Sequence, residues 1–268
     1  MKVVVLKIGG SVQEQLPASF YKKIIELHES NRWMPVIVHG GGPLISSLLT
    51  SLKMETKFVN GLRVTSQQVL DIVEMVLSGS ANKQLVRYLI EAGGKAIGLS
   101  GIDGLLLKAE PIEGAEELGF VGKVVEVNTS VIVEVMKQGY IPVISPVGMD
   151  EKGQRYNING DMAASAIANA LGVNLCLISD IPGIYLDDNN QRIVLEEITK
   201  LEVEAMIEDG QIKGGMIPKV KAAIDGLAHH IPEVSIINGL EESSLYQYCN
   251  GEKTGTKIVL HKEELYVK

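Results

Sequence analysis

The chain has 268 residues, of which 46% are apolar and 22% are charged, and its formal charge is −8. This length suits one large α/β domain or two small ones. The acidic balance, with no basic stripe or interleaved aromatic residues, argues against nucleic-acid binding. The two cysteines, Cys176 and Cys249, fit neither a metal cluster nor a disulfide framework, so we expect a reducing, cytoplasmic setting. With no basic leader and no apolar run of about 20 residues, we expect neither a signal peptide nor a membrane span.

The chain opens with a strand that ends in a glycine turn. Lys2–Ile8 is a nearly continuous apolar run, which is typical of a strand covered on both faces. Gly9, Gly10 and Ser11 follow it, and Lys7 lies one residue before its end. A lysine in such a run is either a solubility residue of an edge strand or a functional cation beside the turn. We favour the functional interpretation.

A second glycine turn follows the next predicted strand. A helix is expected over residues 17–31, and residues 36–38 read as a short buried strand. The turn at 40–42 consists of three glycines, and a helix then runs from Pro43 to about residue 52. Such a bare turn leaves backbone N–H groups and the positive helix end free to meet an anion. A tight turn usually needs only one glycine, so three favour a ligand site.

The middle of the chain alternates helices with strands. We predict a turn at 60–61 followed by Arg63, helices at 66–77, 81–92 and 129–138, and strands at 95–99 and 140–145. Residues 105–109 and 121–127 resemble two strands around a Gly- and Glu-rich loop, which predicts an inserted β-hairpin. This alternation predicts an α/β fold with a mainly parallel, doubly wound sheet.

A polar cluster precedes the alanine-rich helix predicted at 162–171. Asn157, Asn159 and Asp161 fall within five residues at its N-terminus. Ordinary capping would account for one of these side chains. Three of them favour a functional site.

The last third of the chain continues the alternation. We predict strands at 173–179, 234–237 and 256–260, a solvated turn at 187–190, an acidic helix at 196–208, a third glycine turn at 211–216, and a helix at 220–229 opened by Lys219. The turn at 187–190 lacks the remaining ligands of a calcium loop.

The candidate functional groups are cations and glycine turns. The cations are Lys7, Arg63, Lys213 and Lys219, and the sequence shows no nucleophilic triad, zinc cluster, Walker P-loop or GxGxxG fingerprint. Cations and free N–H groups without a nucleophile suit phosphoryl transfer, in which catalysis is mostly positioning and charge stabilisation.

Five motifs, in this order, resemble those of the amino-acid kinase family. They are Lys-Ile-Gly-Gly-Ser (7–11), Val-His-Gly-Gly-Gly (38–42), Asn-Gly-Leu-Arg-Val-Thr (60–65), Asn-Ile-Asn-Gly-Asp (157–161) and Gly-Gly-Met-Ile-Pro-Lys (214–219). The third and fourth motifs together are similar to those of members that act on N-acetyl-L-glutamate.

The resemblance implies ATP-dependent phosphorylation of the side-chain carboxylate of N-acetyl-L-glutamate in arginine biosynthesis, with Mg²⁺ on the ATP. It implies one domain, 1–268, folded as a three-layer αβα sandwich around a mainly parallel open sheet. Residues 1–172 would form an N-terminal lobe for the acyl substrate, and residues 173–268 a C-terminal lobe for the nucleotide.

Residue roles are implied by position in the motifs. Lys7 and Lys219 would flank the transferring phosphoryl group, and Asp161 would orient both lysines. Gly9, Gly41 and Gly42 would supply N–H groups, with Gly41 and Gly42 on the substrate, and Arg63 and Asn157 would hold its α-carboxylate. The implied nucleotide-binding residues are Gly9, Gly10, Asp180, Ile181, Gly183, Ile184, Tyr185, Gln211, Ile212 and Lys213. The sequence does not assign the Mg²⁺ ligands.

Arginine-inhibited members of the family carry an extra N-terminal helix that links dimers into a hexamer. Because the first strand begins at Lys2, we expect a homodimer that arginine does not inhibit. A sister kinase for acetylaminoadipate, aspartate or glutamate stays an alternative, since one methylene changes discrimination by only about 1–3 kcal/mol. A non-catalytic nucleotide-binding regulator and a Rossmann dehydrogenase are further alternatives, against which the set of lysines and the missing fingerprint argue.

Overall fold

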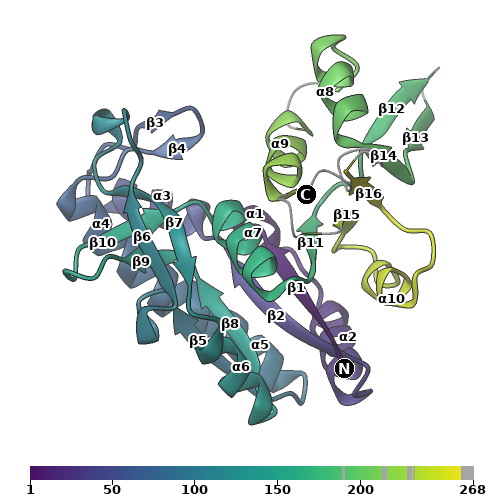
Figure 1. Ribbon diagram of the computed structural model, residues 1–268, viewed down its shortest axis with the longest axis horizontal. Coiled ribbons are helices and arrows are strands. Elements are labelled where there is room, and N and C mark those ends of the chain that lie inside the picture. Colours follow the sequence, from purple (N-terminus) through teal and green to yellow (C-terminus); the bar gives the residue numbers. More distant parts are fainter. Residues whose placement is uncertain (189–190, 213–215, 228–230, 232, 261–268) are drawn as a thin grey trace.

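The computed structural model describes residues 1–188, 191–212, 216–227, 231 and 233–260 (Figure 1). A central eight-stranded sheet has the strand order β14-β16-β15-β11-β1-β2-β8-β5. Its strands are β1 (Lys2–Ile8), β2 (Trp33–His39), β5 (Ala96–Ser100), β8 (Ile141–Ser145), β11 (Asn174–Ser179), β14 (Glu197–Thr199), β15 (Glu233–Asn238) and β16 (Thr256–Val259). Of the neighbouring pairs, β15–β16 is antiparallel and the others are parallel, which confirms the mainly parallel sheet.

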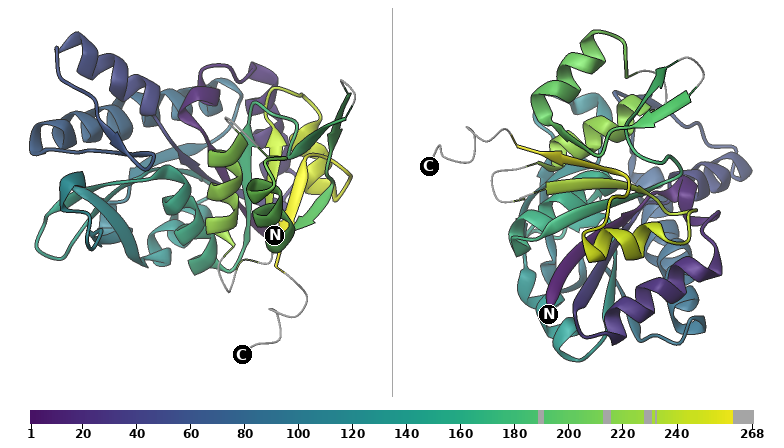
Figure 2. Two further views of the ribbon diagram at one scale, coloured as in Figure 1. Left: turned by 90° about the horizontal axis from the view of Figure 1, so that it is seen from above. Right: turned by 90° about the vertical axis from the view of Figure 1, so that its right-hand side faces the viewer.

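Helices cover both faces of this sheet, so the three-layer αβα arrangement is confirmed (Figure 2). In β1, Val4, Leu6 and Ile8 join a core cluster with α2 (Ala18–Glu29), α5 (Asn82–Glu91) and α10 (Ser244–Asn250). The alternate residue Val5 joins the opposite cluster, with α6 (Thr129–Lys137), α7 (Gly160–Leu171), α8 (Lys200–Glu208) and α9 (Met216–Gly226). A strand with both faces buried in this way explains the continuous apolar run read from the sequence.

The order in which successive strands are added across the sheet reverses at β1. This strand pairs in parallel with β2 on one side and with β11 on the other, so Lys7 lies in register with Val38 and Leu177. In open α/β sheets, ligands bind beyond the carboxyl ends of the strands at such a switch point. The short helix α1 (Gly10–Gln13) follows β1 there, and α3 (Gly42–Ser51) follows β2.

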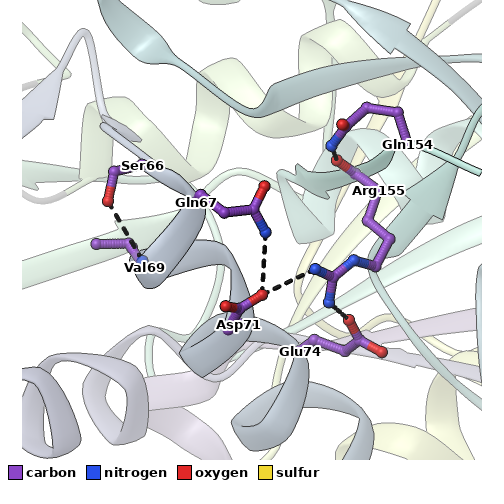
Figure 3. A network of polar contacts seen from close by, with 7 residues as sticks. All are labelled: Ser66, Gln67, Val69, Asp71, Glu74, Gln154 and Arg155. Carbon is purple, nitrogen blue, oxygen red and sulfur yellow. Dashed lines mark hydrogen bonds and ion pairs between the residues drawn. The ribbon is translucent and has the colours of Figure 1, made fainter.

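The predicted inserted hairpin is present, but it is part of a larger unit. β6 (Leu107–Pro111) and β7 (Val121–Val127) pair antiparallel and join β9 (Val147–Met149) and β10 (Arg155–Ile158) in a closed four-stranded barrel. Arg155 on β10 ties this barrel to α4 (Gln67–Glu74) by ion pairs with Asp71, at 2.8 Å, and with Glu74 (Figure 3). The short strands β9 and β10 were not predicted, because three or four residues carry no readable period.

Several boundaries differ from the predicted ones. The two helices predicted at 66–77 and 81–92 are joined through a π-helical segment, η1 (Met75–Ala81). The helix predicted from residue 196 begins at Lys200, where Thr199 and Glu202 form a capping box; the residues just before it form the edge strand β14. Two short antiparallel pairs complete the sheets, β3 (Phe58–Val59) with β4 (Leu62–Arg63) and β12 (Tyr185–Asp188) with β13 (Gln191–Val194).

Parts of two predicted turns lie outside the described residues, namely 189–190 and 213–215. Asp187 and Asp188, the described half of the turn predicted at 187–190, belong instead to β12, whose pairing with β13 the sequence did not indicate. Of the helices described, none is both long enough and apolar enough to cross a membrane.

Candidate active site

A pocket of about 380 Å³ opens at the carboxyl ends of β1 and β2, at the switch point of the sheet. It collects residues from both ends of the chain. Among the residues predicted from the motifs, its lining contains Lys7, Gly9, Gly10, Gly41, Gly42, Arg63, Asn157, Asp161 and Lys219.

Two glycine loops form one wall of this pocket, and they pack backbone against backbone. A Cβ on Gly10 would come within 2.7 Å of the Gly41 nitrogen, and a Cβ on Gly41 within 2.6 Å of the Leu77 side chain. Packing therefore requires glycine at position 10, where the added atom would meet backbone, whereas at position 41 it would meet only the end of the flexible Leu77 side chain. A Cβ on Gly42 would meet nothing within 4 Å. The bare backbone of Gly42 thus has no packing cause and leaves room for a ligand.

The lysines are held by two different carboxylates. Nζ of Lys7 lies 2.6 Å from Oδ1 of Asp161, in the first turn of α7. Lys219, on α9, forms an ion pair with Asp180. The expectation that Asp161 orients both lysines therefore needs correction, since the structure brings Asp161 to Lys7 and Asp180 to Lys219. The hydrogen bond from Lys219 is the main cause that lowers the pKa of Asp180.

Asn159 is the cap of α7, as expected for one member of the polar cluster. Its Oδ1 accepts hydrogen bonds from the backbone nitrogens of Asp161, at 2.8 Å, and Met162, at 3.3 Å. This cap fixes the first turn of α7 and therefore the place from which Asp161 reaches Lys7.

Arg63 is a buried cation with one nitrogen left free. Its Nη2 donates to the carbonyl oxygen of Gly42 (3.1 Å) and to Oγ of Ser46 (2.8 Å), and its guanidinium stacks on Phe58 at 4.7 Å. Only 7% of Arg63 is exposed, and this burial lowers its pKa. Within the described part of the chain, Nη1 has no hydrogen-bond partner. A buried donor without a partner costs free energy.

Asn157 and Arg63, both predicted to bind substrate, are linked through Thr65. Nδ2 of Asn157 donates to Oγ1 of Thr65 at 3.0 Å, and this hydroxyl donates to the carbonyl oxygen of Arg63 at 2.7 Å. The barrel strand β10 is thereby tied to the end of β4. Thr65 and Ser46 carry no sequence signal of their own, because their partners are distant in the chain.

Of the described residues predicted to bind nucleotide, only Gly9 and Gly10 belong to this pocket lining. The side chains of Ile184 and Ile212 are fully buried in the core, so the predicted nucleotide contact at these two residues would involve their backbone. Gly183 has a φ of 140°, and a Cβ there would lie 2.5 Å from Oγ1 of Thr256, so the fold itself requires this glycine. Asp180 and Gln211 are exposed and Ile181 and Tyr185 partly exposed, while Lys213 lies outside the described residues.

His39, at the end of β2, was not predicted as a site residue. It is fully buried, its Nδ1 lies 2.8 Å from the Gly40 carbonyl oxygen, and its Nε2 lies 3.1 Å from Nδ2 of Asn82. Burial lowers the pKa of His39 to about 4. The sequence did contain a signal for His39, namely a histidine placed between a buried strand and a glycine turn.

The described residues hold no group of three or more His, Cys, Asp or Glu side chains placed to bind a metal ion. Asp161 and Asp180 are the carboxylates paired with the two lysines. Their hard oxygen donors are of the type that Mg²⁺ uses, commonly one or two carboxylates together with substrate phosphates.

The chain has a mainly parallel sheet with helices on both faces, and a cationic, glycine-lined pocket lies at its switch point. This combination is typical of α/β proteins that bind anionic ligands. The sequence profile of the amino acid kinase family matches residues 2–238. The chain belongs to this family.

The curated relatives narrow the comparison. The chain is 46% identical over 264 residues to "Acetylglutamate kinase" of Oceanobacillus iheyensis, covering 98% of this chain and 99% of that protein. It is 47% identical over 258 residues to "Acetylglutamate kinase" of Geobacillus kaustophilus, covering 96% of each.

Solved structures agree on the fold. The crystal structure of smu.665 from Streptococcus mutans UA159 has a TM-score of 0.81 and 32% identity, covering 97% of this chain and 99% of that chain. Carbamate kinase from Giardia lamblia has a TM-score of 0.69 at 18% identity, with the same coverage.

Proposed function

We propose that this protein transfers the γ-phosphoryl group of ATP to the side-chain carboxylate of N-acetyl-L-glutamate, a step of arginine biosynthesis. The observation that carries this proposal is the pocket, in which Lys7, Arg63 and Lys219 meet in a chain of net charge −8. A negative protein that concentrates cations in one pocket is suited to anionic ligands. The full-length relatives named above support N-acetylglutamate as the acceptor.

The chemistry requires charge stabilisation rather than a base. A glutamate side chain has a reference pKa of about 4.3, so the acceptor is already ionised at pH 7. The obstacle is repulsion between this carboxylate and the phosphoryl group. A lysine at about 4 Å from a developing charge contributes on the order of 4 kcal/mol at an effective dielectric near 20. Lys7 and Lys219 together offset much of the repulsion.

Arg63 is the proposed anchor of the α-carboxylate. Its Nη2 is already bound to Gly42 and Ser46, so Nη1 is the donor that remains for the substrate. Asn157 contributes an amide group near Arg63, to whose backbone it is linked by hydrogen bonds through Thr65. The bare backbone of Gly42 lets the substrate approach the start of α3, where the helix end favours an anion.

Mg²⁺ is proposed to accompany ATP, and Asp161 and Asp180 are the residues that would hold it. When bound, the ion neutralises charge on the phosphates. The protein residues have separate tasks: Asp161 keeps the Lys7 ammonium in place, and Asp180 does the same for Lys219. Gly9 and Gly10 form the turn next to Lys7, where backbone N–H groups are available to the phosphates.

We propose two lobes, with residues 1–172 for the acyl substrate and 173–268 for the nucleotide. In support, the pocket takes Arg63 and Asn157 from the first part and Lys219 from the second. Asp180, Ile181, Gly183, Tyr185 and Gln211 are proposed to contact the nucleotide beyond the pocket. The family resemblance also supports a cytoplasmic homodimer, which analytical ultracentrifugation would test.

A hydroxylamine trap tests the reaction directly, because hydroxylamine converts an acyl phosphate to a hydroxamate. We expect hydroxamate and ADP to form in equal amounts from MgATP and N-acetyl-L-glutamate. ADP without hydroxamate would mean that water is the acceptor and would overturn the proposal.

A further inference from the structure

The glycine loop after β2 rests on a buried chain of hydrogen bonds that begins at Asn82. Nδ2 of this asparagine, the first residue of α5, lies 2.9 Å from the Val143 carbonyl oxygen, 3.2 Å from that of Leu99 and 3.1 Å from Nε2 of His39. Asn82 and His39 are both fully buried. Gly98 makes room for this arrangement, since a Cβ there would lie 1.9 Å from Oδ1 of Asn82.

These surroundings fix the orientation of the Asn82 amide. The atom that faces two carbonyl oxygens must be the amide nitrogen, and the amide oxygen accepts from Nζ of Lys83 at 3.1 Å. The Asn82 amide has two hydrogens for these three neighbours, and its nitrogen accepts no hydrogen bond, so a proton on Nε2 of His39 would face a donor. The ring is neutral at pH 7, because burial lowers the pKa of His39 to about 4. Its one proton is therefore on Nδ1.

This proton is directed at the glycine loop. Nδ1 of His39 lies 2.8 Å from the carbonyl oxygen of Gly40 and donates to it. The peptide bond is planar and trans, so the Gly40 C=O and the Gly41 N–H point in opposite directions. Holding the oxygen in the interior therefore directs the Gly41 N–H to the other side.

That other side is the pocket wall. The Gly41 nitrogen would lie 2.7 Å from a Cβ on Gly10, and both glycines line the pocket. In the part of the chain that the structure describes, the Gly41 nitrogen donates to no backbone oxygen. Among the described residues its N–H is thus left without a backbone acceptor.

We propose that His39 is a positioning residue for phosphoryl transfer. Its Nδ1–H, in the tautomer that Asn82 sets, holds the Gly40 carbonyl so that the Gly41 N–H meets the reacting anion. His39 acts through the backbone and does not contact the substrate. The inference rests on the proposed function, because the anion is the acceptor carboxylate or the phosphoryl group of that reaction.

Two variants separate donation from packing. His39→Asn places an amide nitrogen near the position of Nδ1 and keeps the donor to Gly40. His39→Gln is closer to histidine in length and reaches Asn82, but its amide lies too far along the side chain to replace Nδ1. A role in packing alone would leave the Gln variant the more stable and the more active of the two.

The proposal predicts the opposite order for activity with MgATP and N-acetyl-L-glutamate. We expect kcat of His39→Gln to fall about 10- to 100-fold with both KM values within about threefold, since a misplaced N–H donor mainly affects the transition state. His39→Asn should retain kcat within about fivefold of wild type. Urea unfolding of both variants supplies the stability comparison. A Gln variant that turns over as fast as the Asn variant would overturn the proposal.

A measurement on the unaltered protein covers the case in which neither variant folds. ¹⁵N NMR of the His39 ring at pH 7 should show a protonated Nδ1 and an unprotonated Nε2. A proton on Nε2, or on both nitrogens, would overturn the proposal. If the wild type fails to phosphorylate N-acetyl-L-glutamate, the proposed function fails, whereas the NMR result still decides the tautomer.

Discussion

Gly10 and Gly41 lie so close together that a methyl group on Gly10 would come within 2.7 Å of the Gly41 nitrogen. The two glycine loops at the carboxyl ends of β1 and β2 therefore support each other. A methyl group on Gly42, one residue further along the chain, would meet no atom within 4 Å. Glycine thus serves two different purposes in this pocket wall. At position 10 it allows close packing of the two loops, and at position 42 it leaves room for a ligand.

This difference predicts that one alanine substitution affects stability and the other affects substrate binding. Gly10→Ala should lower the free energy of unfolding by about 1–3 kcal/mol, since the added methyl meets backbone. Gly42→Ala should leave the unfolding free energy within about 0.5 kcal/mol of wild type and raise the KM for the acyl substrate about tenfold or more. Urea unfolding and steady-state kinetics measure both. If the Gly42 variant bound substrate normally, its backbone would not be a ligand contact.

The lysines are predicted to act on the transition state. Lys7→Ala or Lys219→Ala should lower kcat by about 10²- to 10³-fold with the fold retained, as found when one charge-stabilising donor is removed from an active site. Lys108→Ala is the matched control, because Lys108 on β6 also pairs with carboxylates, Glu126 and Glu151, but does not line the pocket. Its kcat should stay within about twofold of wild type. Wild-type turnover in either pocket variant would remove that lysine from the mechanism.

Arg63 is predicted to determine binding of the acyl substrate. Arg63→Lys keeps the charge but loses the planar fork that joins Gly42 and Ser46 while leaving Nη1 free. We expect the KM for N-acetyl-L-glutamate to rise about 10- to 100-fold, with the KM for ATP nearly unchanged. Ser46→Ala removes one anchor of the guanidinium and should raise the same KM by only a few fold. An equal rise in both KM values would contradict this assignment.

His39 predicts a specific dependence of stability on pH. Its pKa is about 4 in the folded protein and about 6.5 in the unfolded chain. Between these values the unfolded chain binds a proton that the folded protein does not bind. The contribution of His39 is therefore complete above about pH 6.5 and is lost as the pH falls toward 4, by about 3 kcal/mol in total.

The difference between wild type and His39→Asn isolates this contribution, because other titrating groups are shared. On moving from pH 7 to pH 4.5, the unfolding free energy of the wild type should fall by about 2–3 kcal/mol more than that of the variant. Urea titrations at the two pH values measure it. Equal losses in both proteins would show that His39 is protonated in the fold or accessible to water.

The sequence predicted the elements whose patterns are local. The apolar run of β1, the first two glycine turns and one cap among Asn157, Asn159 and Asp161 were predicted because each depends on adjacent residues. The barrel strands β9 and β10 were missed, since their pairing is decided by contacts with β6 and β7 rather than by their own few residues.

The functional roles predicted for the site residues stay predictions, but their placement can be compared with the structure. The motifs brought Lys7, Arg63, Asn157 and Asp161 to one pocket. They could not show that Lys219 pairs with Asp180, or that Asn82 reaches His39 across 43 positions of the chain. Nor could motif positions reveal that the side chains of Ile184 and Ile212 are buried in the core.

The central claim is most directly tested by measuring ADP release from MgATP with N-acetyl-L-glutamate, glutamate, aspartate and acetylaminoadipate in parallel. The account predicts strong turnover with N-acetyl-L-glutamate and little with the other three. Preferred turnover of another acceptor would contradict the assigned substrate while leaving the lysine mechanism in place. Absence of turnover with all four, in a protein that still binds ATP, would contradict the proposed catalysis and favour a regulatory nucleotide-binding protein.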